Sequence, residues 1–338
     1  MNPIRAWNTF WFTPTSAKPL GVFRVVIGAL VLVQLGLLLP DLDYWLTDRG
    51  MVQGVEARMV AGPLRPSPLQ WVQDPLTVRA FMAMSAVAAV AVMLGWRTRA
   101  STVALYLLLL SIHHRNILTN CGPDNLLLLM VFYLMISPCG RAYSLDARRE
   151  ARRRGTLAEP IIIPWAQRLI QLHLSLIYFD TAMLKCAGAT WLGGTAMHFV
   201  LHNPEVGRFD FSFLTQYPVL INILTHAALV AEFALAFLLW FRATRPWMIA
   251  LGLGLHGVIL FIVNVPLFGE LMTACYITYL SPDELERGLR ALDPRTWFAA
   301  PPARRATLPA TVRIDRAHDD STTNVALADE RVTESAWR

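Results

Sequence analysis

Apolar stretches of membrane-spanning length recur along this chain and limit what it can fold into. The hydrocarbon core of a bilayer is ~30 Å thick, and crossing it takes roughly 20 helical residues. The candidate spans cover residues 19–39, 76–94, 100–118, 125–136, 165–184, 219–241, 247–263 and 267–280. Hydrophobic residues make up 55% of the sequence and charged residues 16%, a balance that soluble domains rarely have. We therefore predict an all-α fold, a polytopic helix bundle of about eight transmembrane helices in a lipid bilayer.

Arginine and lysine indicate the orientation of these spans, because they are retained on the cytoplasmic side of short loops. Most of the 30 basic residues lie in the N-terminal segment, in loops 96–100, 141–155 and 241–246, and after residue 283. Both termini are therefore predicted to be cytoplasmic, in a multi-pass protein of the cell inner (plasma) membrane. The net charge of +6 then reflects membrane topology, so no nucleic-acid partner is expected.

Composition divides the chain into three parts. Residues 1–17 carry Trp7, Phe10 and Trp11 and are predicted to lie along the inner headgroups as an interfacial segment. Residues 18–282 form the transmembrane helical domain. Residues 283–338 begin with a short amphipathic helix and are otherwise polar and poor in aromatic residues, which predicts a cytoplasmic, largely disordered tail.

The fifth span is the richest in polar residues. Gln171, Tyr178 and Lys185 are spaced by seven residues and therefore share one helix face, while His173 and Asp180 lie on roughly the opposite face. A helix that is polar on both sides cannot face lipid, so it is predicted to lie inside the bundle. Asp180 is ~140° round the helix from Lys185, and we expect it to form a structural hydrogen bond with another helix.

Lys185 lies at the predicted outer end of this helix, where the arginine and lysine pattern makes a lysine unusual. One interpretation is a side chain that extends to the outer headgroups. The other is a lysine in an apolar pocket beside the segment CAGATWLGG, where loss of hydration favours the neutral amine and lets it act as a base.

The sixth and seventh spans contain Glu232 and His256, which are equidistant in sequence from Thr244 in the turn between them. They are therefore predicted to lie at one depth and to form a hydrogen bond, either as a structural clasp or as a proton relay. His198 and His202 have the spacing of a helical metal pair, but no third ligand is evident and no metal site is expected.

Four ordered segments carry a family resemblance. They are LGVFRVVIGALVLVQLGLLLPDLDYWLTDRG, NILTNCGPDNLLLLMVFYLMISPCGRAYSLDA, QLHLSLIYFDTAMLKCAGATWLGGTAM and LHGVILFIVNVPLF. Together they resemble the horizontally transferred transmembrane domain family, which includes the vitamin K-dependent gamma-carboxylase.

The resemblance implies a quinol-dependent modifying enzyme, a carboxylase-like lyase with its active site in the outer half of the membrane. Lys185 looks like the base that deprotonates reduced vitamin K or another quinol, and Tyr178, Trp191 and His256 look like cofactor-binding positions. The sequence differs from the carboxylase pattern in three ways. Asp124 lies near the position of a carboxylase histidine, and a single lysine, Lys185, lies where the carboxylase has two in succession. The large lumenal domain of the carboxylase has no counterpart in this sequence.

Three functions therefore remain in competition. The first is a quinol-dependent enzyme that modifies a secreted peptide or protein. The second is a non-catalytic membrane scaffold or maturation partner for a secreted peptide, in which the same polar groups hold helices together. The third is a transporter that uses Glu232 and His256 as a proton site, although no internal repeat supports it.

Overall fold

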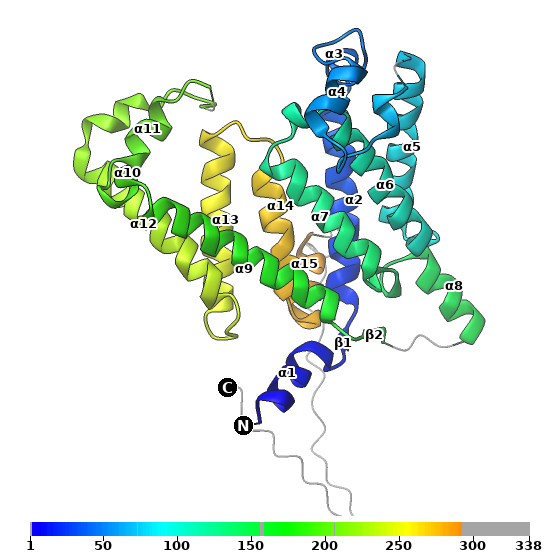
Figure 1. The fold of residues 1–338 in the computed structure, drawn as a ribbon. Coiled ribbons are helices and arrows are strands. Elements are labelled where there is room, and N and C mark those ends of the chain that lie inside the picture. The colour runs from blue at the N-terminus through cyan, green and yellow to red at the C-terminus, as the bar shows by residue number, and fades with distance from the viewer. Residues whose placement is uncertain (1, 73, 156–158, 206, 293–338) are drawn as a thin grey trace, which may run out of the picture. The chain divides into compact units, whose positions relative to one another are not determined.

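The computed structural model describes residues 2–72, 74–155, 159–205 and 207–292, and nearly all of its regular structure is helical (Figure 1). The long helices are α2 (Lys18–Leu38), α5 (Pro75–Leu94), α6 (Thr98–Arg115), α7 (Gly122–Ile136), α9 (Trp165–Cys186), α12 (Pro218–Leu238) and α13 (Arg245–Ile262). Every apolar stretch of the sequence contributes helix, so the prediction of an all-α fold is confirmed.

Shorter elements connect these helices. The short α-helices are α1 (Pro3–Phe12), α3 (Leu42–Leu46), α4 (Gly54–Ala61), α8 (Leu145–Arg154), α10 (Ala189–Leu192), α11 (Ala196–His202), α14 (Phe268–Cys275) and α15 (Pro282–Leu292). The 3₁₀ turns are η1 (Pro68–Gln70), η2 (Ile117–Thr119), η3 (Cys139–Arg141), η4 (Ser212–Gln216) and η5 (Tyr276–Tyr279). Helix α15 agrees with the expected amphipathic helix; the predicted disorder of residues 293–338 falls outside the described residues.

Four helices of the described part are long and apolar enough to cross a bilayer, namely α2, α5, α12 and α13. The fourth predicted span is the 15-residue α7, and the eighth is the 8-residue α14 followed by η5. The chain is a multi-pass membrane protein, while the count of eight spans and the cytoplasmic position of both termini stay predictions.

Prolines define where several of the long helices begin. Each of α2, α5, α7, α12 and α13 has proline in its first turn, where the missing N–H is not needed by the helix. The side chain of Asp74 also caps α5 by accepting a hydrogen bond from Thr77 N at 3.0 Å.

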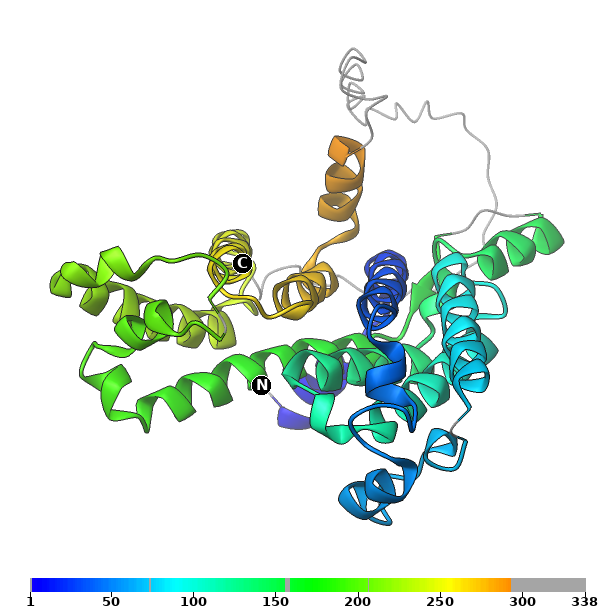
Figure 2. The ribbon, with the colours of Figure 1, turned by 90° about the horizontal axis from the view of Figure 1, so that it is seen from above.

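Helix α2 forms the centre of the bundle. Half of an 18-residue apolar stretch of α2 is buried, whereas only 11% of the corresponding stretch of α13 is buried. Helix α2 packs on α5, α7 and α14. Its buried side chains Phe23, Ile27 and Val31 join Leu105 and Leu127 of α6 and α7 in one core. Figure 2 shows α9 lengthwise beside α2 and α13, which are seen nearly end-on, so α9 crosses the bundle obliquely. It contacts α7 and α12 along the way.

A tight junction forms where α5 ends. Gly95 terminates the helix with φ 64°, and the buried Arg24 of α2 lies against it. The guanidinium of Arg24 donates hydrogen bonds to the carbonyl oxygens of Val92, Met93 (3.1 Å) and Tyr143 (2.7 Å). These bonds satisfy carbonyls at the C-terminus of α5 and join it to the segment before α8.

A two-stranded antiparallel ladder lies near the start of α2. Strand β1 (Thr15–Ser16) pairs with β2 (Ile161–Ile162), and the backbone N–H of Ala17 donates to Pro160 O at 2.8 Å. The ladder fixes the segment before α2 to the segment before α9.

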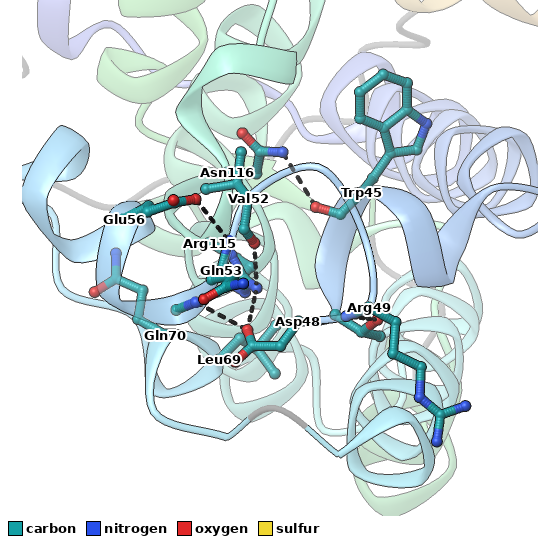
Figure 3. Close-up of polar contacts among 12 residues, drawn as sticks. Trp45, Asp48, Arg49, Val52, Gln53, Glu56, Leu69, Gln70, Arg115 and Asn116 are labelled. Carbon is teal, nitrogen blue, oxygen red and sulfur yellow. Dashed lines mark hydrogen bonds and ion pairs between the residues drawn. The ribbon is translucent and has the colours of Figure 1, made fainter.

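At the other end of α2, a buried arginine holds the loop that contains α3 and α4 (Figure 3). Arg115 Nη2 donates to Asp48 Oδ1 and to Val52 O, both at 3.0 Å, and Asn116 Nδ2 donates to Trp45 O at 3.1 Å. These bonds tie the loop to the end of α6, alongside its buried apolar side chains Leu42, Leu46 and Val52.

Candidate functional site

One face of α9 carries the polar stripe that the sequence predicts. Gln171 and Tyr178 are both 2% exposed, and Gln171 Nε2 donates to Thr278 O of η5 at 2.6 Å. His173, on another face, lies 3.4 Å from the Tyr133 hydroxyl of α7. This half of α9 is therefore inside the bundle, as expected.

Lys185 ends this stripe in an ion pair with Glu232 of α12. Its Nζ lies 2.5 and 2.6 Å from the two carboxylate oxygens, and the side chains are 22% and 13% exposed. Lys185 is neither an isolated amine in an apolar pocket nor a side chain extended alone to the headgroups. The expected hydrogen bond between Glu232 and His256 is wrong, because Glu232 faces the oblique α9 rather than α13.

Trp191 covers the ion pair. After α9 the chain turns through α10, and the Lys185 Nζ lies 5.2 Å from the centre of the Trp191 ring. A cation over an indole face is attracted by the ring quadrupole. The sequence pattern that paired Lys185 with Trp191 thus corresponds to a direct contact.

Tyr178 joins a second polar group, which contains His256 of α13 and Tyr276 of η5. The Tyr178 hydroxyl lies 2.6 Å from His256 Nε2 and also contacts the Tyr276 hydroxyl. All three side chains are buried, and His256 Nδ1 has no hydrogen-bond partner within the described residues. Tyr276 was missed by sequence reasoning; its position in the last apolar stretch, where a phenol needs a partner, was the available signal.

Thr181 lies between the two groups. It shares the face of Tyr178 and Lys185 on α9, and its hydroxyl is 3.3 Å from Glu232 Oε2. This face of α9 therefore contributes to two polar groups, one formed by Lys185, Glu232 and Thr181 and the other by Tyr178, His256 and Tyr276.

With this geometry established, the comparisons identify the family. The HTTM domain, the horizontally transferred transmembrane domain, matches residues 12–283. The chain belongs to this family. No curated protein and no solved structure matches the chain.

Asp124 lies in a different cluster of the HTTM domain. Its Oδ1 accepts a hydrogen bond from Gln34 Nε2 at 2.5 Å, and its Oδ2 accepts one from Cys121 N at 2.9 Å. Gln34 Nε2 is also 3.1 Å from His113 Nε2. Asp124 therefore caps α7 and ties it to α2 and α6, and no described contact joins it to Lys185.

Two further expectations concern Asp180 of α9 and the histidine pair His198 and His202 of α11. Asp180 is exposed and makes no hydrogen bond or ion pair with any described residue, so the expected contact with another helix is wrong. The rings of His198 and His202 stack with centroids 4.5 Å apart. No cluster of metal-ligating residues is found within the described ranges.

Two cavities of the HTTM domain lie away from Lys185. One of about 410 Å³ is bordered by Tyr106, Asn125, Leu128, Leu129 and Phe132. The other, of about 900 Å³, lies among residues 97–161. The Lys185 site is therefore distinguished by ionisable side chains that lie close together, and not by a large cavity.

Gly252 of α13 allows the Tyr276 hydroxyl to approach Tyr178. A Cβ at this position would lie 2.0 Å from the Tyr276 oxygen, so Gly252→Ala is expected to displace the phenol and to destabilise the protein by about 1–3 kcal/mol. Thermal unfolding in detergent measures the effect. Gly254→Ala on the same helix, which has no atom within 4 Å of the added carbon, is the control and should be neutral or stabilising. Equal stabilities of the two variants would contradict the close approach.

Proposed function

We propose that this HTTM protein is a membrane-embedded enzyme that removes a proton from the hydroxyl of a quinol-type lipid, in a plasma (inner) membrane. Lys185 is the base and Glu232 is its proton partner. The observation that carries the proposal is the ion pair of Lys185 with Glu232 under the ring of Trp191, between helices of a membrane domain.

The residues present are compatible with a quinol. Of what an aromatic diol needs, Lys185 would supply the base beside its hydroxyl and Trp191 an indole ring, one face of which already contacts the Lys185 ammonium. His256 adds a buried Nδ1 without a described partner, and Tyr178 orients that ring through Nε2. When bound, reduced vitamin K or another quinol would supply an acidic hydroxyl and reducing equivalents.

Lys185 must lose a proton before it can accept one. Glu232 Oε1, at 2.5 Å from Nζ, is placed to accept this proton in the proposed mechanism. The partial burial of both side chains favours such a transfer, because burial raises the free energy of separated charges. The amine Nζ would then be the group that accepts a proton from the hydroxyl of a bound quinol, and as an ammonium it would stabilise negative charge beside it.

Reconstitution tests this function. The full-length protein in proteoliposomes is supplied with reduced vitamin K or menaquinol, oxygen, radiolabelled bicarbonate and a glutamate-containing peptide, and quinol consumption and label incorporation are measured. Wild type is expected to consume quinol and Lys185→Ala to lose this activity. Asp180→Asn is the matched control, because this carboxylate lies on the exposed face of the same helix. Equal signals from wild type and Lys185→Ala would remove Lys185 from the mechanism.

A scaffold or peptide-maturation partner is the second candidate, and the same contact favours it. The ion pair joins α9 to α12, and for a scaffold its sole role would be to hold these two helices together. Absence of quinol consumption by wild type, together with a loss of stability in Lys185→Ala, would favour this function. The transporter hypothesis loses the Glu232–His256 contact on which it was based, because Glu232 pairs with Lys185 and His256 contacts Tyr178.

A further inference from the structure

A second candidate binding site shares no residue with the Lys185 site. A cavity of about 900 Å³ is formed by the start of α6, by η3 and by one face of α8. Four arginines line it, Arg97, Arg99, Arg141 and Arg154. The distribution of basic residues predicts that this end of the bundle faces the cytoplasm.

The carboxylates of this cavity already have partners. Asp146 accepts hydrogen bonds from Arg97 N at 3.0 Å and from Thr98 N and Oγ1, both at 2.7 Å. Burial raises the pKa of Asp146, but these bonds outweigh it and leave the pKa below its usual value, so this group stays charged and bound. Glu150 pairs with Arg154, and Glu159 lies 3.5 Å from Lys18 Nζ.

Three guanidinium groups are left without an acidic partner. Arg97 lies over the Trp96 ring at 5.6 Å, and Arg99 Nη1 donates to Met135 O at 3.2 Å. Arg141 is exposed, and none of the three forms an ion pair with any described residue. The lining therefore has four arginines and three carboxylates, one of which, Glu159, pairs with Lys18 outside the lining, so positive charge is in excess.

Apolar side chains lie next to this charge. Ile161 lines the cavity and is 63% exposed, and the neighbouring Trp96 and Tyr143 are each 45% exposed. A free phosphate ion would have no use for such surface, whereas a lipid presents a phosphate attached to apolar chains. Guanidinium groups bind phosphate oxygens in bidentate geometry.

We propose that this cavity binds the phosphate headgroup of an anionic phospholipid through Arg97, Arg99 and Arg141. Membrane topology alone requires basic residues on this side but no cavity between them. Helix α8 illustrates the difference, because Arg148, Arg149 and Arg152 add the same charge without lining the cavity.

Native mass spectrometry of the full-length protein tests the site. The protein is exposed to an equal mixture of phosphatidylglycerol and phosphatidylcholine, and the retained lipids are counted. The cavity variant Arg97→Gln/Arg99→Gln/Arg141→Gln is compared with the matched variant Arg148→Gln/Arg149→Gln/Arg152→Gln. Each arginine at an anionic surface contributes roughly a factor of five to binding, so the cavity variant should bind phosphatidylglycerol roughly a hundredfold more weakly. The matched variant should lose clearly less than the cavity variant, because its arginines do not line the cavity.

Three results would overturn the proposal. Equal losses in the two variants would mean that only total charge matters, and no loss in either would mean that the cavity is not a lipid site. Displacement of phosphatidylglycerol by millimolar inorganic phosphate would assign the cavity to a free anion instead. If the triple glutamine variant does not fold, Arg141→Gln replaces it, with an expected loss of about fivefold.

Discussion

Lys185→Ala and Glu232→Ala are each expected to destabilise the protein by about 3 kcal/mol, because either change leaves a poorly solvated charge without its partner. Both side chains are less than one quarter exposed, so bulk water compensates little for the loss. The same variants are expected to reduce quinol-dependent turnover by about 10²–10⁴-fold, the typical contribution of a positioned base. Thermal unfolding in detergent and the reconstituted assay measure the two effects.

The exchanged variant Lys185→Glu/Glu232→Lys separates the structural contribution of the pair from its chemical one. Exchange keeps one charge of each sign at the contact between α9 and α12, so most of the lost stability should return. Turnover should not return, because the amine then extends from α12 and no longer lies under Trp191. Recovery of both properties would show that the position of the base does not matter. Recovery of neither would show that packing, rather than charge, governs the site.

Gly95→Ala is expected to destabilise the protein by about 3–5 kcal/mol, the largest effect of any glycine substitution considered. Its φ of 64° costs a residue with a side chain roughly 1–2 kcal/mol. In addition, the new Cβ would lie 2.2 Å from the Ser144 Cβ and 2.6 Å from Arg24 Nη1, so the buried guanidinium would have to leave its carbonyl partners. Thermal unfolding in detergent is the measurement.

Gly62→Ala is the matched control for Gly95→Ala. Gly62 has nearly the same φ, 68°, but no atom within 4 Å of the position of an added Cβ. It should therefore show only the backbone cost of roughly 1–2 kcal/mol. If both variants lose the same stability, the junction of Arg24 with the end of α5 is not the tight contact described above.

The polar stripe of α9 shows what residue spacing can predict about a helix and what it cannot. Seven-residue spacing placed Gln171, Tyr178 and Lys185 on one face, and the structure confirms that this face packs inward. The same spacing could not indicate which helix the face would meet. Equal sequence distances from Thr244 suggested that Glu232 meets His256, but distance along a helix gives depth and not rotation about its axis. Glu232 faces α9, and His256 meets Tyr178.

The amino-acid sequence by itself determined that this chain is a multi-pass helical membrane protein, because long apolar stretches with few charges have few alternatives to helices in lipid. It also identified the segments that place the chain in the HTTM family. Only the tertiary structure decided the partners of the polar groups, since the oblique course of α9 brings Lys185 to Glu232. The side chains that meet are decided by how helices distant in sequence cross and how each is rotated about its axis. The spacing of residues within one helix gives no information on the crossing or on the rotation.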